Sequence, residues 1–532
     1  MEEGYQLLKK HLNSDHEIFL VVDPDVDGYT SSSLVYNYLT EVLKEKCPTI
    51  NYHIPEGKEH GLQTIMDWFP EDGTNKLVLL PDSSSNDYKC HTQLKDRGYD
   101  ILVLDHHEAP RYSEAAIVIN NQLSQKYSNK SLSGVGVVYK FLEYFERREG
   151  VPSESQNYLD IVALGQVSDM MDMTTLENRW ICDYGLSHIN NDFFKALIEA
   201  RAYSLGDGPL TQIGVAFYIT PLINALIRVG NSVEKENLFK AFIEPNLVVK
   251  STKRGETDKF ETLATQLARI CTNAKSRQDR QKEKAADFLN IQIFNNNLED
   301  NKILILNADE LDVANTLTGL CAMGVAAAHK KPVILGRTSP DGFLKGSARG
   351  RGESELKDFK NFLNESGLVS YAEGHANAFG VGVKLTDIDK LNAYANKKLA
   401  NVNFNEGSYD VDFVVESNCS YLDDLIIDLD SNKKFWGQAC PEPLIAVENL
   451  NIDKANIKTI GANQDTLRFE FNGITYIKFK AKDLIEEFNS IACPKVNLNI
   501  VGKANLNSWG GRTTPQIVIE ELEIKETSIY DF

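Results

Sequence analysis

Four separated segments of the sequence carry carboxylates or histidines in patterns that suit metal binding. The first is Asp23–Gly28, in which acidic residues alternate with others. In an extended segment, alternate side chains share a face, so Asp23, Asp25 and Asp27 can converge. Carboxylates this close repel one another unless a cation lies among them. The segment therefore predicts a cation site, and Gly28 would allow a tight turn into a following helix.

A solvated turn is the simplest alternative for this segment, and part of a calcium-binding loop is another. The calcium loop of an EF-hand needs a glutamate at its twelfth position and a helix before it. Leu34 stands at that position, and the run before the segment is apolar and strand-like. The EF-hand interpretation is therefore rejected, whereas the solvated turn stays open.

In each of the other three segments, an acidic or imidazole group comes at or just after the end of an apolar run. Asp82 follows one run and Asp169 another, and an aspartate of this kind is most often a helix cap. The remaining segment is Asp105-His106-His107. Adjacent histidines project in different directions, so one can ligate a metal while the other faces a substrate. A neighbouring carboxylate can fix the imidazole tautomer.

The four segments together favour a particular chemistry. Mixed oxygen and imidazole ligands suit Mn²⁺ or Mg²⁺ rather than metals that prefer thiolates. Two such cations close together can activate water and stabilise the leaving oxygen of a phosphodiester. The residues therefore predict a site for hard divalent cations, of a kind that can hydrolyse a phosphodiester.

The runs that precede these groups predict short buried strands. Residues 17–22, 76–81 and 100–104 are apolar, and 163–167 is a fourth such run. Helical patterns alternate with them, the first from about Ser31, as is typical of a parallel α/β sheet. Ligands bind at the carboxyl ends of the strands in such sheets, so the acidic groups would meet at one edge.

The chain has 532 residues, which is too long for one hydrophobic core. Residues 258–298 contain neither Pro nor Gly and predict one long exposed helix. A second α/β pattern begins at Lys302, and strand-like alternation dominates beyond residue 405, with turns at Asn472-Gly473 and Gly510-Gly511. The predicted regions are a parallel-sheet domain at 1–240, a connector at 241–298, a smaller α/β domain at 299–403 and a β-barrel at 404–532.

The composition is that of an ordinary soluble protein, with 42% hydrophobic and 25% charged residues. We find no apolar run long enough to span a membrane and no signal peptide, so we expect a cytoplasmic protein. The eight cysteines form no CxxC pair and should be reduced and mostly buried. The net charge of −20 argues against coating nucleic acid by bulk attraction. Residues 250–284 (+5) and 329–360 (+4) could still form a local basic channel, or simply solvated helix faces.

The order of these segments resembles the DHH phosphoesterase superfamily, in which DxDxDG, a strand-end aspartate, Asp-His-His and ALGxVxD follow one another. Further segments are similar to its RecJ-type single-strand-DNA exonucleases. In the first half these are Ser133–Val137, Glu177–Arg179, Tyr184–Leu186, Pro221–Ala225 with Arg228, Asn273 and Arg277–Gln278. In the second half they are Lys345–Arg349, Gly374–Gly380, Trp436–Pro443, Asn507–Gly510 and Pro515–Gln516. The resemblance covers nearly the whole chain in collinear order.

The resemblance implies a DHH domain, a DHHA1 domain and a terminal OB-like barrel, and it gives the site residues particular roles. Two divalent cations, Mn²⁺ or Mg²⁺, are implied. Their implied ligands are Asp25, Asp27, Asp82, His106 and Asp169, with Asp23 as a further candidate. His107 would face the scissile phosphate, with Asp105 supporting it and Asp25 completing the catalytic set.

Contacts to DNA are also implied by the resemblance. Ser347, Arg349, Gly374 and His375 would line the DNA path, with Arg277 and Arg228 as further contacts. Arg349 is the best anchor because a guanidinium pairs with phosphate through two hydrogen bonds. Four barrel aromatics are candidates for base stacking, although alternation makes each equally suited to the core: Phe469, Phe471, Tyr476 and Phe479.

Three positions depart from the family pattern. Val21 stands where the family usually has a histidine, so one metal would bind more weakly or Asp23 would substitute. Glu373 replaces the first glycine of the GGH loop and adds negative charge beside a phosphate path. Leu222 replaces the arginine of the PRINA segment and removes one basic contact. We interpret the chain as a divergent, short or phage-like member.

The implied activity is removal of 5′-mononucleotides from single-stranded DNA in the 5′→3′ direction, in DNA repair, recombination or replication. Single-stranded DNA is then the expected partner, with a single-strand-binding protein or helicase as a further candidate and a monomer as the default. Two other functions stay open. A DHH phosphodiesterase of short oligonucleotides or cyclic dinucleotides is disfavoured by the terminal barrel, and a non-catalytic replication scaffold by the retained acidic residues.

Overall fold

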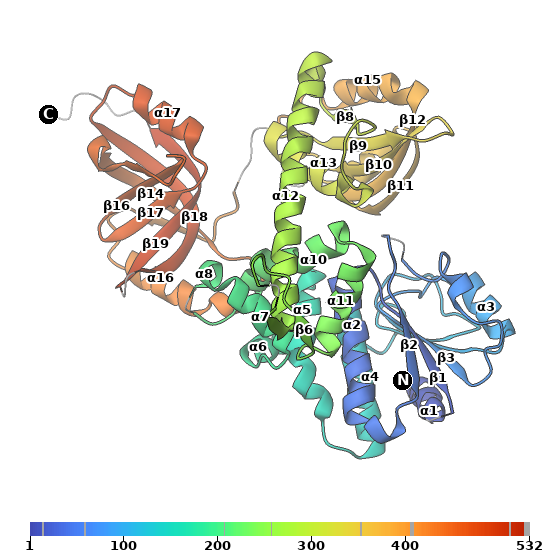
Figure 1. Cartoon of the computed structure of the whole chain (residues 1–532). Helices are drawn as coiled ribbons and strands as arrows, with labels where there is room; N and C mark the ends of the chain where they lie inside the picture. Colours follow the sequence, from blue (N-terminus) through green and yellow to red (C-terminus); the bar gives the residue numbers. More distant parts are fainter. Residues whose placement is uncertain are drawn as a thin grey trace. The chain divides into compact units, whose positions relative to one another are not determined.

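The computed structural model describes residues 1–12, 15–57, 60–206, 208–256, 258–351, 354–404, 409–509 and 512–525. The chain forms two compact units (Figure 1). The first holds Met1–Tyr52, Gly61–Thr220 and Tyr409–Phe532, and the second holds His53–His60 and Pro221–Ser408. The first unit contains a parallel sheet and a C-terminal β domain, whereas the second contains a mixed sheet and a long helix.

A five-stranded sheet near the N-terminus carries three of the acidic segments. Its order is β2-β1-β3-β4-β5, and the pairs β1–β3, β3–β4 and β4–β5 are parallel. The strands are β1 Glu17–Val21, β2 Thr49–His53, β3 Lys76–Pro81, β4 Asp100–Asp105 and β5 Ile117–Asn120. Almost every residue of β1, β3 and β4 is buried, as in sheets covered on both faces. The predicted parallel α/β sheet is confirmed.

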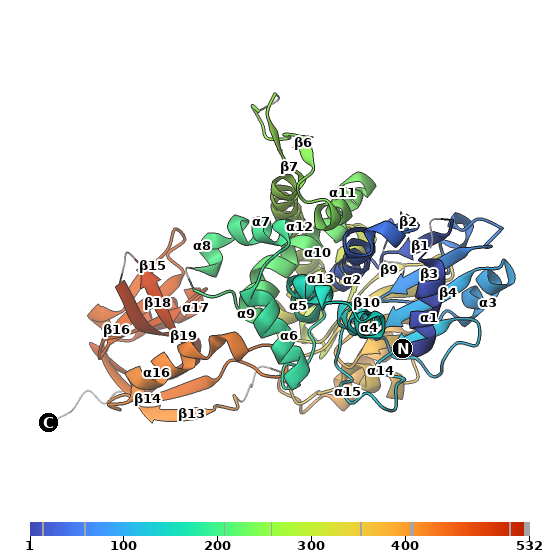
Figure 2. The ribbon, with the colours of Figure 1, turned by 90° about the horizontal axis from the view of Figure 1, so that it is seen from below.

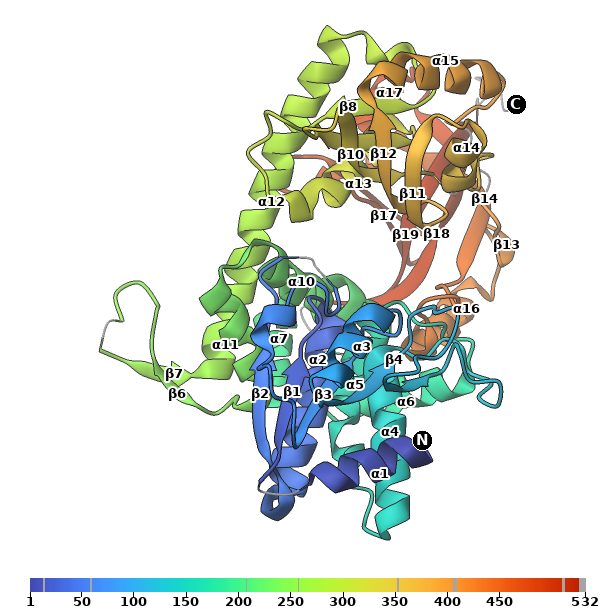
Figure 3. The same ribbon diagram turned by 90° about the vertical axis from the view of Figure 1, so that its right-hand side faces the viewer.

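Helices cover both faces of this sheet. On one face, Leu94 of α3 packs with Phe19, Val78 and Val103. On the other face, α1 lies beside α4 (Figures 2 and 3). The first helices of this unit are α1 Glu2–His11, α2 Val26–Asn37, α3 Tyr88–Asp96 and α4 Gly134–Glu149. The later ones are α5 Leu159–Ser168, α6 Leu176–Ser187, α7 Asp192–Ala200 and α8 Ala202–Leu205.

Two sequence-based element predictions are wrong. Helix α2 begins at Val26 rather than near Ser31, so Asp27 lies in its first turn. The run 163–167 is not a strand but part of α5, in which every residue except the last is buried. A short, continuously apolar run suits a buried helix as well as a buried strand, and periodicity cannot distinguish them. Asp169 therefore follows a helix.

One apolar stretch was also missed. Gln212–Val229 is long and apolar enough to cross a membrane by length and composition. It comprises α9 Gln212–Gly214, a π-helical turn Val215–Ile219 and α10 Thr220–Val229. Since 56% of it is buried inside the protein, it fits a core helix equally well.

The second unit combines helices with a mixed sheet of order β11-β12-β10-β9-β8. Its strands are β8 Leu304–Asn307, β9 Val333–Thr338, β10 Phe343–Arg349, β11 Val369–His375 and β12 Ala378–Lys384. Its other elements are α11 Ser232–Ile243, the hairpin β6 Val248–Lys250 and β7 Phe260–Thr262, α12 Leu263–Asn295, α13 Thr318–His329, α14 Phe359–Glu365 and α15 Ile388–Lys398. The predicted long helix is thus α12, but it is not wholly exposed, because Ala285, Leu289 and Ile293 pack into a core with α13.

The C-terminal β domain is a seven-stranded sheet of order β13-β14-β18-β19-β17-β16-β15. Its strands are β13 Phe413–Glu416, β14 Leu444–Asp453, β15 Lys458–Ile460, β16 Thr466–Phe471, β17 Ile474–Lys478, β18 Lys495–Trp509 and β19 Arg512–Lys525. Helices α16 Leu422–Ser431 and α17 Lys482–Ser490 accompany them. Asn472 and Gly473 both have positive φ, which confirms a turn there, whereas Gly510-Gly511 lie outside the described residues.

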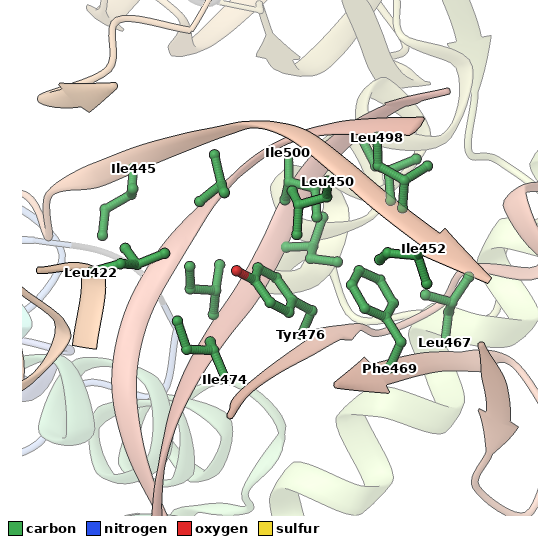
Figure 4. Close-up of a cluster of buried hydrophobic side chains, with 14 of the residues drawn as sticks. Leu422, Ile445, Leu450, Ile452, Leu467, Phe469, Ile474, Tyr476, Leu498 and Ile500 are labelled. Carbon is green, nitrogen blue, oxygen red and sulfur yellow. The ribbon is translucent and has the colours of Figure 1, made fainter. Parts of the chain in front are cut away.

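The stacking prediction is wrong for two of the four barrel aromatics. Phe469 and Tyr476 are 2% and 0% exposed, and their rings stack on each other at 5.0 Å inside the core (Figure 4). Phe471 is partly buried against that core. Phe479 is 55% exposed and is the only one of the four placed to meet a ligand in solvent.

Candidate active site

The first acidic segment is a helix cap that also presents its carboxylates. Asp25 precedes α2 and its Oδ1 accepts a hydrogen bond from the Gly28 backbone N–H at 2.9 Å. Gly28 lies within the helix rather than in a turn, and a Cβ there would come within 2.5 Å of the Asp23 backbone oxygen. The glycine is therefore needed for a close approach, which corrects the role expected for it.

Asp82 follows β3 in a backbone conformation that L-residues rarely adopt, with φ of 62°. Its backbone N–H donates to the Leu104 carbonyl at 2.8 Å, which fixes it beside the end of β4. The side chain is buried, and its Oδ1 makes no hydrogen bond to a described residue, although His106 Nε2 lies 3.2 Å away. A strained backbone and a buried oxygen without a hydrogen bond are both typical of functional sites.

His106 lies at the centre of three carboxylates. Its Nε2 is 3.2 Å from Asp82 Oδ1, 3.4 Å from Asp169 Oδ2 and 3.8 Å from Asp27 Oδ2. These residues come from a helix start, two strand ends and a helix end. The structure thus brings together groups that are far apart in sequence, although Asp169 arrives from α5 instead of a strand.

Two sets of possible ligand atoms meet at this point. One consists of Asp27, His106 and Asp169, and the other of Asp23, Asp25 and Asp82, with the atoms of each set within 4.8 Å of one another. Asp82 also groups with the two histidines. Such adjoining oxygen-rich sets, with one imidazole, fit two hard divalent cations. Val21, the last residue of β1, has no ligating atom and packs in the core against that sheet.

The electrostatics of the cluster also require positive charge. Burial, followed by the nearby carboxylates, raises the pKa of Asp82 well above its usual range. Burial and repulsion from Asp27 and Asp25 raise the pKa of Asp169 to about 8. Burial likewise raises the pKa of Asp27. A bound cation would remove this penalty, so the residues present fit the metals that the ligand types suggest.

His107 is held by a buried carboxylate. Its Nδ1 is 2.8 Å from Asp105 Oδ1, and that hydrogen bond raises the pKa of His107 to about 9. Burial alone would raise the pKa of Asp105, but hydrogen bonds from His107 and Ser85 hold it below its usual range. Because an ionised carboxylate only accepts, Nδ1 must donate, which leaves Nε2 to contact a substrate.

Sequence reasoning missed the residues that hold the cluster in place. The backbone N–H groups of Gly134 and Val135, at the start of α4, donate to Asp27 at 2.6 and 3.1 Å. A Cβ on Gly134 would lie 2.2 Å from Asp82 Oδ1, and one on Gly165 would lie 2.6 Å from Asp27 Oδ1. The glycine-rich segment was visible in the sequence, but the contact that requires it was not.

Asn120 is a second missed residue, and no sequence pattern marks it. Its Nδ2 donates to the His107 carbonyl at 2.9 Å and to Ser85 Oγ at 2.8 Å. It therefore ties the end of β5 to the loop that carries the two histidines. This contact fixes the backbone from which His106 and His107 project.

The expected DNA-contacting residues lie in the second unit. Ser347 and Arg349 are on β10 and His375 is on β11, and their register across β12 places all three on one face of the sheet. Arg228 is near enough to lower the pKa of Arg349, after burial as the larger cause. Two guanidinium groups near each other on one unit give a local positive charge that suits an anion.

Two more of the expected DNA-contacting residues, Gly374 and Arg277, are described by their own contacts. Gly374 has φ of 129°, which few L-residues adopt, and its carbonyl accepts from Lys360. Arg277 pairs with Glu234 of α11 at 3.0 Å, with its side chain 38% exposed. Glu373, the departure from the GGH pattern, is exposed and shares the face of Ser347.

Comparison with known proteins agrees with this architecture. Residues 17–166 match the model of the DHH family N-terminal domain, and residues 416–521 match that of the RecJ OB domain. A Bacillus subtilis protein, the putative SPbeta prophage-derived single-strand DNA-specific exonuclease YorK, is 37% identical over 99% of this chain and 91% of its own length. The single-stranded-DNA-specific exonuclease RecJ of the same bacterium is 24% identical over 100% of this chain and 64% of its own length.

Solved structures share the fold. The crystal structure of RecJ in complex with Mn²⁺ from Thermus thermophilus aligns with a TM-score of 0.73 at 19% identity, covering 99% of this chain and 72% of that one. The Mg²⁺ complex of RecJ from that organism aligns with a TM-score of 0.68 at 20% identity, covering 99% and 70%. Family models at both ends, a full-length relative and a shared fold all point to one group, so this chain belongs to the RecJ-type single-strand-DNA-specific exonucleases of the DHH superfamily.

Proposed function

We propose that this protein is a metal-dependent exonuclease that degrades single-stranded DNA from its 5′ end and releases 5′-mononucleotides. The convergence of Asp82, Asp169 and Asp27 on His106 Nε2 carries the proposal. A scaffold without catalysis would have no need to gather buried carboxylates whose mutual repulsion costs free energy. The full-length similarity to proteins described as single-strand-DNA exonucleases gives the polymer substrate.

The residues that would hold the metal ions are those of the two ligand sets. They are Asp23, Asp25, Asp27, Asp82, His106 and Asp169. Mn²⁺ or Mg²⁺ bound there would supply Lewis-acid chemistry, lowering the pKa of a water and neutralising charge on a phosphate. Asp23 takes the place left by Val21, because it lies within reach of Asp25 and Asp82.

The protein's own groups bind and orient the phosphate. The hydrogen bond from Nδ1 to Asp105 raises the pKa of His107 and favours the protonated ring, whose Nε2–H donates to a non-bridging phosphate oxygen. Asp105 holds the ring in that orientation through Nδ1. Two backbone N–H groups at the start of α4 donate to the Asp27 carboxylate and keep it oriented toward the site. Preorganisation of this kind lowers the reorganisation cost of the reaction.

The second unit would grip the strand. The Arg228–Arg349 pair and Ser347 offer charged and neutral donors for backbone phosphates, and the exposed His375 lies on the same face. These contacts carry no base information, so cleavage should be independent of sequence. Processing of single strands in repair, recombination or replication is the cellular setting we propose, with a single-strand-binding protein or helicase as partner.

A polarity assay tests the proposal directly. Oligonucleotides labelled at the 5′ or the 3′ end are incubated with the protein and Mn²⁺, and products are resolved over time. The 5′-labelled strand should release labelled mononucleotide at once, whereas the 3′-labelled strand should shorten gradually. Immediate mononucleotide release from the 3′ end would reverse the polarity, and the absence of products with Mn²⁺ or Mg²⁺ would remove the enzyme assignment.

A further inference from the structure

A small β-hairpin of the second unit has two very different faces. Strands β6 (Val248–Lys250) and β7 (Phe260–Thr262) pair in antiparallel register. The hairpin projects beside α11 and the start of α12 (Figures 2 and 3). It plays no part in the metal cluster or in the Arg349 face described above.

The inner face of the hairpin is mounted firmly on α12. Glu261 of β7 accepts two hydrogen bonds from Arg269, at 2.8 and 2.7 Å, and this ion pair lowers the pKa of Glu261 to about 2. Gln266 donates to the Lys250 carbonyl at 2.8 Å and to Glu261 at 3.2 Å. Bidentate guanidinium–carboxylate pairs fix geometry as well as adding energy. The hairpin is therefore a rigid arm rather than a loose loop.

The outer face combines apolar and cationic side chains in solvent. The register places Lys250 opposite Phe260 and Val248 opposite Thr262, so these four side chains share the outer face. Phe260 is 69% exposed and Val248 is 66% exposed. Phe260 and Val248 therefore present two apolar side chains to solvent on the same face as the cationic Lys250.

The charge of the arm suits a polyanion. Residues 250–260 contain four cationic and two acidic side chains in a chain whose net charge is −20. Lys259 pairs with Glu256 at 3.3 Å. Lys250, Lys253 and Arg254 are exposed, and they make no side-chain ion pair with any other described residue. An exposed aromatic ring flanked by unpaired cations is the combination by which proteins bind single-stranded nucleic acid without reading its sequence.

We propose that the outer face of the β6–β7 arm binds single-stranded DNA as a second anchor, separate from the metal site. A base stacks on Phe260, and Lys250, Lys253 and Arg254 contact the flanking phosphates. This inference rests on the proposed function for its ligand. It adds a site whose contribution appears only when the substrate is long enough to reach the arm as well as the metal cluster.

Binding of a length series of fluorescent oligothymidylates with cleavage-resistant phosphorothioate linkages, measured by anisotropy with Mn²⁺ present, tests the arm. Phe260→Ala should weaken binding of long strands about 5- to 150-fold, the usual effect of removing one stacked base. Strands that fill only the metal site should bind both proteins equally. Lys253→Ala/Arg254→Ala should lower the slope of log affinity against log salt by about 1.4, which corresponds to two lost phosphate contacts.

Matched controls separate this proposal from the proposed function. Phe294 on α12 is 82% exposed and lies outside the arm, so Phe294→Ala should bind every length like the wild type. If wild type cuts single strands while Phe260→Ala binds all lengths normally, the arm serves another partner and the inference is wrong. If Phe260→Ala weakens all lengths equally, the anchor is not separate. If wild type neither binds nor cuts single strands, both proposals fail.

Discussion

At the scale of single residues, the clustered carboxylates destabilise the metal-free protein but provide the ligands that the proposed reaction needs. Asp82 is among the most buried of the clustered ligands, and its neighbours and its burial both oppose its ionisation. Each charge placed there costs free energy until a cation neutralises it. The strained backbone at Asp82 adds to that cost, which indicates that the position is maintained for its function rather than for the fold.

Asp82→Asn should therefore remove activity without loosening the fold. An amide of the same shape takes away the repulsion and also a charged ligand. We expect turnover to fall by about a thousandfold or more, equivalent to about 4 kcal/mol. The melting temperature in EDTA should equal or exceed that of wild type, and its rise with Mn²⁺ should shrink. A variant that melts far below wild type in EDTA would make Asp82 a structural residue.

His91 predicts a pH dependence of stability that is independent of the metal site. It is fully buried on α3, its Nδ1 contacts Ser113 at 3.1 Å, and burial lowers its pKa. The unfolded chain then binds more protons than the folded one as pH falls below about 6.5. The contribution of His91 to the free energy of unfolding should therefore decrease as pH falls from about 7.5 to about 5.5. In urea titrations, the free energy of unfolding of wild type should fall relative to that of His91→Gln over this range, because the other titrating groups cancel in the difference. A difference that stays constant with pH would contradict the assignment.

At the scale of elements, helix starts do much of the positioning. The first turn of α2 supplies Asp27, and the first turn of α4 donates two backbone N–H groups to it. Helix N-termini carry partial positive charge and stabilise a carboxylate that would otherwise be repelled by its neighbours. The junction of these two helices is therefore as important to the site as the ligands themselves.

Gly134→Ala tests this junction, with Gly324→Ala as a matched control. The new Cβ at Gly134 would lie 2.2 Å from Asp82 Oδ1, so Asp82 or α4 must move. We expect a large loss of activity and weaker Mn²⁺ binding by calorimetry. Gly324 is also helical but has nothing within 4 Å of its added Cβ, so alanine there should stabilise the protein by up to about 1 kcal/mol. Equal activity of both variants would show that the contact is not needed.

The sequence predicts the candidate ligands and most strands of this site, but not helix α5 or the contacts that position the ligands. The ligands of the DHH-type segments can be recognised from the sequence because Asp and His are metal-binding residue types wherever they occur. Strands β1, β3 and β4 are recognisable because short apolar runs end in acidic loops. Helix α5 was predicted as a strand because a run buried on all sides has no periodicity. The roles of Gly134 and Asn120 depend on neighbours distant in sequence, which no local pattern contains.

At the scale of the whole molecule, a local sequence pattern also does not show which face of an element is buried. The alternation of β16 and β17 predicts which aromatic residues share a face of the sheet, but not which face packs in the core. In the structure, Phe469 and Tyr476 are the buried residues. Phe469→Ala should cost about 3–5 kcal/mol in the C-terminal domain, while Phe479→Ala should cost little. Thermal melts of the two variants, followed by circular dichroism, check this. Similar losses for both would place Phe479 in the core as well.

The division into two compact units has a thermodynamic consequence. All six candidate ligands belong to the first unit, so a cation stabilises that unit directly and the second only through whatever couples them. At a hundredfold excess over its dissociation constant, a ligand adds about 2.7 kcal/mol to the unit that binds it. Hydrogen exchange with and without Mn²⁺ should therefore show protection in peptides from β1, α2, β4 and α4 but not in peptides from β8–β12. The Asp82→Asn variant, which keeps the fold but loses a ligand, should lose most of that protection. Equal protection across both units in wild type would mean that the chain unfolds as one cooperative body, and that the metal site governs the stability of the whole molecule.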